Sequence, residues 1–257
     1  MIQFSSGFIR GSSFRSSDGL LSLADGSFPL ETGNLKPETI FFMLDAARMV
    51  ALLAPFLDKA DPPPQLIAQL QTYLDLLLRW NASMNLTAVR DPEQIVTRHF
   101  GESLFAARAL RDPGASCSGG ILADIGSGAG FPGIPIKLLL TSLQLTLIES
   151  QNKKVTFLRE VIRSLAIAGA EVFCGRAEGW PRQADIVTLR AVERFDLVLP
   201  IAAGRVAPGG TLCLLISSSQ QKTAEMVLES PWVGREPQPV PNTRDRVVFC
   251  LQRAGNQ

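Results

Sequence analysis

The chain has no run of apolar residues long enough to cross a membrane. Its longest apolar run, Met49 to Leu57, is interrupted by Pro55 and is far shorter than the roughly 18–20 residues that a membrane-spanning helix needs. A hydrophobic content of 46% with 19% charged residues excludes a wholly disordered chain. The 257 residues are enough for one large globular domain or for one domain with an appendage.

The chain also has little net charge, no closely spaced cysteine pair and a single histidine. The formal net charge is +1, so any polyanionic partner must be met by a local basic patch. The four cysteines are far apart and form no C-x-x-C pair, which argues against a structural zinc and predicts reduced thiols in the cytoplasm; they are Cys117, Cys174, Cys213 and Cys250. We expect no metal site, and the one histidine, His99, cannot alone identify a catalytic base.

The amino-terminal part of the chain divides into two segments. Residues 1–36 are rich in Ser and Gly, and this composition predicts a disordered tail. They also lack the continuous apolar core of a secretory signal. Residues 37–115 predict a helical segment, beginning with a helix from Pro37 to about Lys59. After the Asp61–Pro64 break, leucines at three- and four-residue intervals predict a second helix. Pro92 opens a short helix through Arg98 and His99, and another helix covers 102–110.

Residues 116–257 alternate between predicted strands and helices, which indicates an α/β domain with a mostly parallel sheet. Two last strands, near 235–240 and 246–252, predict an antiparallel hairpin at one edge. The other expected strands are 121–125, 144–149, 171–174, 185–189 and 211–216, and the expected helices are 132–140, 152–166, 195–206 and 220–229.

The most informative motif joins the strand at 121–125 to the helix that follows it. It reads Asp124-Ile125-Gly126-Ser127-Gly128-Ala129-Gly130. Glycines in such a turn leave the main chain open to a ligand, and the following helix offers free N–H groups and the positive end of its dipole. A dinucleotide fold requires G-x-G-x-x-G, but Phe131 occupies the third glycine position. The observed G-x-G-x-G spacing resembles the S-adenosylmethionine loop of Rossmann-like methyltransferases.

A carboxylate ends the second predicted strand. Glu149 follows the apolar run Leu145–Ile148, a position from which an acid can accept hydrogen bonds from both ribose hydroxyls. This geometry supports a nucleoside ligand, and Glu149 by itself does not distinguish S-adenosylmethionine from NAD.

Further motifs resemble those of the glucose-inhibited division protein B family, the bacterial methyltransferases that modify guanine N7 in small-subunit (16S) ribosomal RNA. They cover roughly residues 64–216 and are Arg79-Trp80-Asn81, Asn85-Leu86-Thr87, Arg98-His99-x-x-Glu102-Ser103, Asp124 through Pro135, Lys153-Lys154 to Phe157-Leu158-Arg159, and Arg190-Ala191. The resemblance implies a class I methyltransferase sheet with an amino-terminal helical extension, and S-adenosylmethionine as cofactor. It also implies ribosomal RNA or a ribosomal subunit as partner, and we expect a monomer in the cytoplasm.

The resemblance also implies the site residues. Gly126 and Phe131 would contact the cofactor, Glu149 its ribose, and Ala177 and Glu178 the adenine region. Arg190 would lie beside cofactor and substrate, and it is a candidate for positioning the substrate; the alternative is a surface arginine that pairs with Glu193. The complete set expected at the cofactor is Asp124, Gly126, Gly128, Gly130, Phe131, Glu149, Ala177, Glu178 and Arg190.

Candidate RNA contacts lie on two helical segments. Lys153 and Lys154, with Arg159 and Arg163, form a cationic run that is either an RNA contact or a solvated helix face. Arg98 and His99 either hold a phosphate or order the loop between the helices and the sheet. Stacking on an extruded base is open to Trp80, Phe100 and Arg190, although we expect Trp80 to belong to the core.

The implied chemistry requires no catalytic dyad, and we assign no acid or base. Guanine N7 has an in-plane lone pair and no proton to lose, so methyl transfer depends on alignment and exclusion of water. Two departures from the family pattern stand out: Glu102 replaces an aspartate, and Leu215-Ile216-Ser217 replaces Leu-Lys-Gly. The missing lysine, which Lys222 could replace, keeps open a methyltransferase for another substrate. Two further alternatives are a non-catalytic module that binds cofactor or ribosome and a nicotinamide oxidoreductase, which Phe131 disfavours.

Overall fold

The computed structural model describes residues 44–58, 62–111, 119–192, 194–228 and 231–255. The predicted tail at 1–36, the predicted start of the first helix and the predicted boundary between residues 115 and 116 lie outside these ranges. The division into a tail, a helical segment and a methyltransferase domain therefore stays a prediction. Within the described ranges, no helix combines the length and the apolar content that a membrane span requires.

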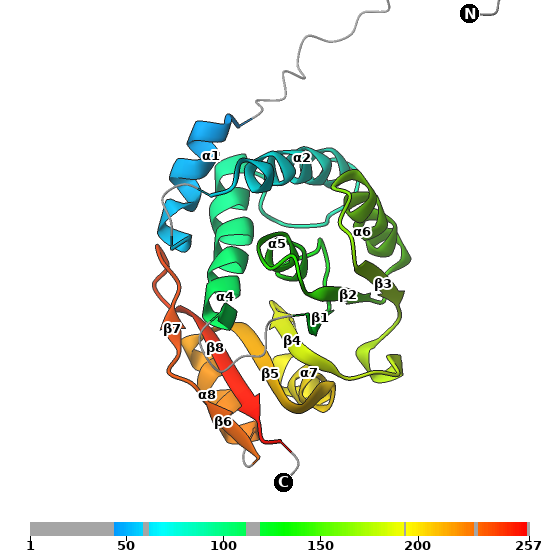
Figure 1. The fold of residues 1–257 in the computed structure, drawn as a ribbon, viewed down its shortest axis with the longest axis vertical. Helices are drawn as coiled ribbons and strands as arrows, with labels where there is room; N and C mark the ends of the chain where they lie inside the picture. Colours follow the sequence, from blue (N-terminus) through cyan, green and yellow to red (C-terminus); the bar gives the residue numbers. More distant parts are fainter. Residues whose placement is uncertain (1–43, 59–61, 112–118, 193, 229–230, 256–257) are drawn as a thin grey trace, which may run out of the picture. The chain divides into compact units, whose positions relative to one another are not determined.

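Eight strands of the described chain form one sheet (Figure 1) in the order β3-β2-β1-β4-β5-β8-β6, with β7 also paired to β8. Strands β1 to β5 run parallel, whereas β8 is antiparallel to β5, β6 and β7. This order confirms the predicted Rossmann-like sheet with an antiparallel carboxyl-terminal edge. The bounds are β1 Ile121–Ile125, β2 Gln144–Glu149, β3 Ala170–Cys174, β4 Ala184–Arg190, β5 Val206–Ser217, β6 Trp232–Gly234, β7 Gln238–Pro239 and β8 Arg246–Arg253.

Helices cover both faces of the sheet (Figure 1), as a buried parallel sheet requires. One face packs against α4 (Glu102–Arg111), α5 (Gly133–Leu139) and α6 (Asn152–Ser164), with α1 (Ala46–Leu53), the short helix η1 (Ala54–Phe56) and α2 (Pro64–Asn81) outside them. The other face packs against α7 (Phe195–Gly204) and α8 (Ser218–Val227). The one-turn helix η3 (Ala177–Gly179) follows β3.

A wide helical turn lies between α3 and α4. Helix α3 (Pro92–Ile95) continues without a break into the π-helix η2 (Val96–Gly101) and then into α4. Its start follows the predicted signals, because Pro92 occupies the first turn and the Asp91 side chain accepts a hydrogen bond from the Gln94 N–H at 2.8 Å. Such π-turns often occur at functional sites, and this one contains Arg98 and His99.

Three predicted elements differ most from the observed bounds. The helix predicted from Pro37 to about Lys59 is not continuous, because Leu44 and Asp45 are not helical; α1 begins at Ala46, and the Asp45 carboxylate caps it by accepting from the Arg48 N–H at 2.7 Å. The strand predicted at 235–240 is only the two-residue β7, since Pro237 and Pro239 cannot donate ladder hydrogen bonds, and β6, which precedes it at Trp232–Gly234, was not predicted. Strand β5 is longer than predicted and begins at Val206, with an irregular register opposite Ala184 and Ile186.

Candidate active site

A cavity of about 230 Å³ opens at the carboxyl ends of β1, β2 and β3. The strand order reverses between β1 and β4, and such a reversal is where open α/β sheets bind ligands. The cavity contains four of the predicted cofactor residues, Gly126, Glu149, Ala177 and Glu178. Its other lining residues are Ile125, Ile148, Ser150, Gly175, Arg176, Val192, Val198 and Ile201.

The glycine loop follows β1 and crosses the end of β2. The N–H groups of Gly126 and Ser127 both donate to the Ile148 carbonyl, at 2.9 and 3.1 Å, which ties the loop to the neighbouring strand. Gly128 has φ +57°, a conformation that side chains with a Cβ rarely adopt, and a Cβ there would contact only the Gly126 carbonyl oxygen, at 3.8 Å. The main chain at Gly128 is thus open to a ligand in a way that only glycine permits without strain.

Glu149 is buried, and the chain itself holds its carboxylate. One carboxylate oxygen accepts from the Gly128 N–H at 3.0 Å, and the other accepts from the Gln151 N–H at 2.8 Å. Each oxygen keeps acceptor capacity, because a carboxylate can accept about four hydrogen bonds. The carboxylate is therefore fixed at the cavity wall and can still accept from a pair of hydroxyl groups.

Asp124 lies beneath the loop and does not line the cavity. Its carboxylate accepts from the Thr188 hydroxyl at 2.7 Å and from the Gly133 N–H at 3.2 Å. Burial raises the pKa of Asp124 to about 6, although both hydrogen bonds oppose that rise. Asp124 thus joins β1, β4 and the start of α5 below the loop.

Phe131 and Gly130 face the helical segment. The Phe131 ring stacks on Tyr73 at 5.3 Å and on His99 at 4.8 Å between ring centroids, and it does not line the cavity. The Tyr73 hydroxyl donates to the Ala129 carbonyl. A Cβ on Gly130 would lie 2.4 Å from the Tyr73 hydroxyl oxygen, so this position has room only for glycine. The helical segment therefore supports the loop from its outer side.

Arg190 ends β4 and is almost wholly buried. One guanidinium nitrogen donates to Glu102 at 2.9 Å and to the Arg98 carbonyl at 2.6 Å. Arg246 of β8 contacts the same Glu102 oxygen at 3.1 Å. Arg190 is thus not the surface arginine of the alternative prediction, because it is buried and its ion pair is with Glu102. The second Glu102 oxygen and the Arg190 Nε are buried without a hydrogen-bond partner.

His99 packs between these groups. Its Nε2 lies 2.8 Å from the Thr87 hydroxyl, and its Nδ1 lies 3.3 Å from an Arg190 nitrogen. Burial, followed by the charges of Arg190, Arg98 and Arg246, lowers its pKa to about 3. His99 is therefore a neutral ring at pH 7, and it connects the π-turn to both the loop and Arg190.

The remaining predicted RNA residues lie near the same edge of the sheet. Arg98 is exposed in the π-turn, while Lys153 is exposed and Lys154 half-buried in the first turn of α6, directly after β2. Phe100 is fully buried, and half-buried Trp80 packs edge-on against Phe157 at 5.6 Å as part of the core. Neither ring is open for stacking on a base.

Ile216 occupies the position at which the family pattern has a lysine, and Lys222 is the candidate to replace that lysine. Ile216 is buried in the apolar cluster beneath α7 and α8, whereas Lys222 of α8 is exposed. Directly beside Ile216, Ser217 pairs across the sheet with Arg246, which brings a cation to Glu102 from the last strand. Arg246 was not predictable from the sequence, because its role depends on a contact between residues 144 positions apart.

The apolar cavity wall was also missed. Val198 and Ile201 come from α7, and Val192 comes from the turn before it. Their spacing along a helix indicates only a core-facing side, so no sequence signal assigns them to a ligand. Arg176, which is exposed and immediately precedes Ala177, could have been found from its place after the third strand.

The cavity fits a nucleoside of the expected kind. It combines glycine main chain at Gly126 and Gly175, a fixed carboxylate that can accept from hydroxyl groups, and an apolar wall against which a planar base can pack. No group of three or more His, Cys, Asp or Glu side chains that could hold a metal occurs among the described residues. The sheet order and this cavity define the chain as a class I, Rossmann-like methyltransferase fold.

Comparison with known proteins identifies the family. The family described as GidB, rRNA small subunit methyltransferase G, matches residues 66–233, and the chain belongs to this family. It is 38% identical to ribosomal RNA small subunit methyltransferase G of Stenotrophomonas maltophilia strain K279a, over 72% of this chain and 82% of that protein.

Two further similarities agree. The same-named protein of Xanthomonas oryzae pv. oryzae is 44% identical over 147 residues, which are 56% of this chain and 66% of that protein, so the match spans slightly less than two thirds of that relative. The crystal structure of a ribosomal protein L11 methylase from Lactobacillus delbrueckii subsp. bulgaricus superposes with a TM-score of 0.52 at 12% identity, covering 62% of this chain and 80% of that one. The structural likeness supports the fold.

Proposed function

We propose that this protein transfers a methyl group from S-adenosylmethionine to N7 of a guanine in bacterial small-subunit (16S) ribosomal RNA. The observation that carries the proposal is the cavity at the carboxyl edge of the sheet, where Gly126, Glu149, Ala177 and Glu178 meet. These residues come from three separate turns, and their convergence is what a nucleoside cofactor requires. The names of the relatives supply the RNA substrate.

Different residues of the cavity would contact different parts of the cofactor. Glu149 accepts hydrogen bonds from the ribose hydroxyls, since each of its oxygens already has one N–H donor and keeps a free lone pair. Val198 and Ile201 pack on one side of the adenine, and Ala177 and Glu178 border its edge. Gly128 presents main chain to the amino-acid part of the cofactor.

The chemistry then requires positioning rather than proton transfer. When bound, S-adenosylmethionine supplies a methyl group that is already activated by its sulfonium. Guanine N7 has its lone pair available, so the protein must hold the base in line with that methyl group and exclude water. The neutral His99 ring and the mostly buried Arg190 fit this requirement, because neither is arranged to remove a proton.

We assign Arg190 to substrate positioning through the π-turn. Its bonds to the Arg98 carbonyl and to Glu102 fix the turn at the end of β4. The exposed Arg98, together with Lys153 and Lys154, then contacts RNA phosphates near the cavity. Because the proposed substrate is ribosomal RNA, the proposed location of the reaction is the cytoplasm.

Methyl transfer to small ribosomal subunits tests the proposal. Purified protein is incubated with radiolabelled S-adenosylmethionine and small subunits that lack the modification, and the label is mapped by nucleotide. A label on N7 of a guanine in 16S RNA is the expected result. Labelled protein or small molecules would indicate another substrate, and tight cofactor binding without turnover would indicate a non-catalytic relative. Gly128→Val serves as the inactive control.

A further inference from the structure

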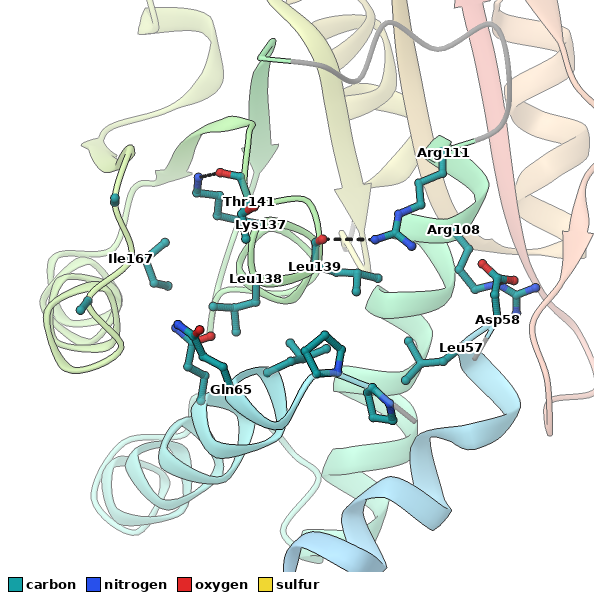
Figure 2. Close-up of a pocket in the computed structure, with 16 residues that line it drawn as sticks. Leu57, Asp58, Gln65, Arg108, Arg111, Lys137, Leu138, Leu139, Thr141 and Ile167 are labelled. Carbon is teal, nitrogen blue, oxygen red and sulfur yellow. Dashed lines mark hydrogen bonds and ion pairs between the residues drawn. The ribbon is translucent and has the colours of Figure 1, made fainter. Parts of the chain in front are cut away.

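A larger cavity, of about 610 Å³, lies at the opposite edge of the sheet (Figure 2). It opens beside the turns that precede β2 and β3 and shares no lining residue with the cofactor cavity. Its volume falls within the range typical of small-ligand sites. The lining residues are Leu57, Asp58, Pro62, Pro63, Gln65, Leu66, Gln69, Arg108, Arg111, Lys137, Leu138, Leu139, Thr141, Ala166, Ile167 and Ala168.

The charges of this cavity are unbalanced. Among the described residues that line it, three are cationic and one is a carboxylate, a formal excess of two positive charges, and the carboxylate of Asp58 already lies 2.5 Å from the Arg108 Nε. Arg111 is exposed and uses one N–H to reach the Leu139 carbonyl at 3.3 Å (Figure 2). A guanidinium carries five N–H donors, so Arg111 has donors available for an anion.

Lys137 adds a cation that is almost wholly buried. Its ammonium donates to the carbonyls of Thr141 and Leu143, both at 2.6 Å, and among the described residues no carboxylate lies within ion-pair distance. Burial accordingly lowers the pKa of Lys137. A buried cation without a counter-charge is costly, and an anion in the adjacent cavity would offset part of that cost.

The other walls are apolar with a few polar side chains. Leu66 comes from the first turn of α2, Leu138 from α5, and Ile167 from the turn before β3. Gln65, also from the first turn of α2, adds a polar amide to the cavity lining (Figure 2). Helix α2 has no acidic residue in its first turn, and of the carboxylates in the described part of the chain only that of Asp58 lines the cavity. The walls therefore suit a planar, partly apolar group attached to an anion.

We propose that this cavity binds one nucleotide of a single-stranded RNA segment, as a second RNA contact far from the methyl-transfer site. The phosphate pairs with Arg111 in the field of Lys137, and the base packs between Leu66, Leu138 and Ile167. An unpaired nucleotide matches this combination, because its base can pack against apolar side chains while its phosphate accepts hydrogen bonds from an arginine. The identification of the RNA rests on the proposed function, whereas the cavity and its charge do not.

Binding measurements with two cavity variants test this proposal. The probes are a five-nucleotide single-stranded RNA and adenosine 5′-monophosphate, each titrated by calorimetry in the presence of excess S-adenosylhomocysteine to occupy the cofactor cavity. Arg111→Ala removes the exposed phosphate donor, and Ile167→Trp fills the cavity. Arg244→Ala is the matched control, because Arg244 is an exposed arginine of the turn before β8 and lines neither cavity. Thermal unfolding verifies that each variant is folded.

We expect both cavity variants to weaken RNA binding by about tenfold, while Arg244→Ala leaves it within twofold of the unmodified protein. Equal RNA affinity in all the variants overturns the proposal, as does binding of the mononucleotide without binding of the RNA. If Ile167→Trp fails to fold, the RNA affinity of Arg111→Ala alone tests the proposal, because Arg111 is exposed and its removal should leave the protein folded. Methyl transfer by the unmodified protein is measured on the same preparation, so that loss of this second contact and loss of the proposed activity are separate results.

Discussion

Replacing the chain's single tyrosine with phenylalanine tests the link between the helical segment and the glycine loop. Tyr73 is fully buried, and its hydroxyl donates to the Ala129 carbonyl between Gly128 and Gly130. Tyr73→Phe keeps the ring that packs on Phe131 and removes one donor. The effect therefore reports on that hydrogen bond with little change in packing.

The expected cost follows from leaving a buried carbonyl without its donor. Such a loss destabilises a protein by about 1–3 kcal/mol, which for a domain of this size lowers the melting temperature by about 2–4 °C per kcal/mol. Urea unfolding measures the free energy. Because Ala129 belongs to the loop, we also expect the affinity for S-adenosylhomocysteine to fall by up to about tenfold in calorimetric titration.

Trp80→Phe is the matched control, since Trp80 packs on Phe157 in the same core without touching the loop. It should lower stability and leave cofactor affinity unchanged. A free energy of unfolding for Tyr73→Phe within about 0.5 kcal/mol of the unmodified protein, with unchanged cofactor affinity, would refute the reasoning. Alkaline titration gives an independent test: burial, followed by the charge of Asp124, raises the Tyr73 pKa well above 10. The tyrosinate absorbance should therefore appear only on unfolding.

Three further predictions concern the site. Gly128→Val should abolish S-adenosylhomocysteine binding, because valine is strained at φ +57° and its side chain projects from the loop; undiminished titration heat would contradict this placement. Glu102→Gln should lower the free energy of unfolding, measured in urea, by about 3–5 kcal/mol, because it leaves buried Arg190 without its counter-charge. Glu102→Asp keeps the charge and should lower it less; an equal decrease in both variants would argue against a charge effect. Since the folded pKa of His99 is about 3 against an ordinary 6.5, its contribution to stability is complete above pH 6.5 and declines by up to about 5 kcal/mol toward pH 3. His99→Gln should lack this decline, and parallel pH profiles of the two proteins would contradict it.

The elements nearest the cofactor were predictable because their signals are local. The bounds of β1 and β2 agree with prediction to the residue, since a short apolar run between a glycine pair and a glycine loop, or between polar turns, permits few alternatives. Gly126, Glu149, Ala177 and Glu178 were expected at one edge because parallel strands place their carboxyl ends together. The structure brings these four residues to one cavity.

The support beneath that cavity was not predictable in the same way. The pairing of Arg190 with Glu102 joins residues 88 positions apart, and the Tyr73 bond to Ala129 spans 56. In sequence, Tyr73 is one of several apolar positions on α2, and nothing distinguishes it from the leucines around it. Such contacts depend on how α2 and the π-turn pack on the sheet, and periodicity does not specify that packing.

The position of β8 inside the sheet determines when the fold can be completed during translation. Residues 246–253 pair with β5 on one side and with β6 and β7 on the other. A nascent chain that has not reached Arg246 therefore has an open β5 edge and only one cation at Glu102. Unpaired edges promote aggregation, so the emerging chain keeps an aggregation-prone β5 edge until β8 is made.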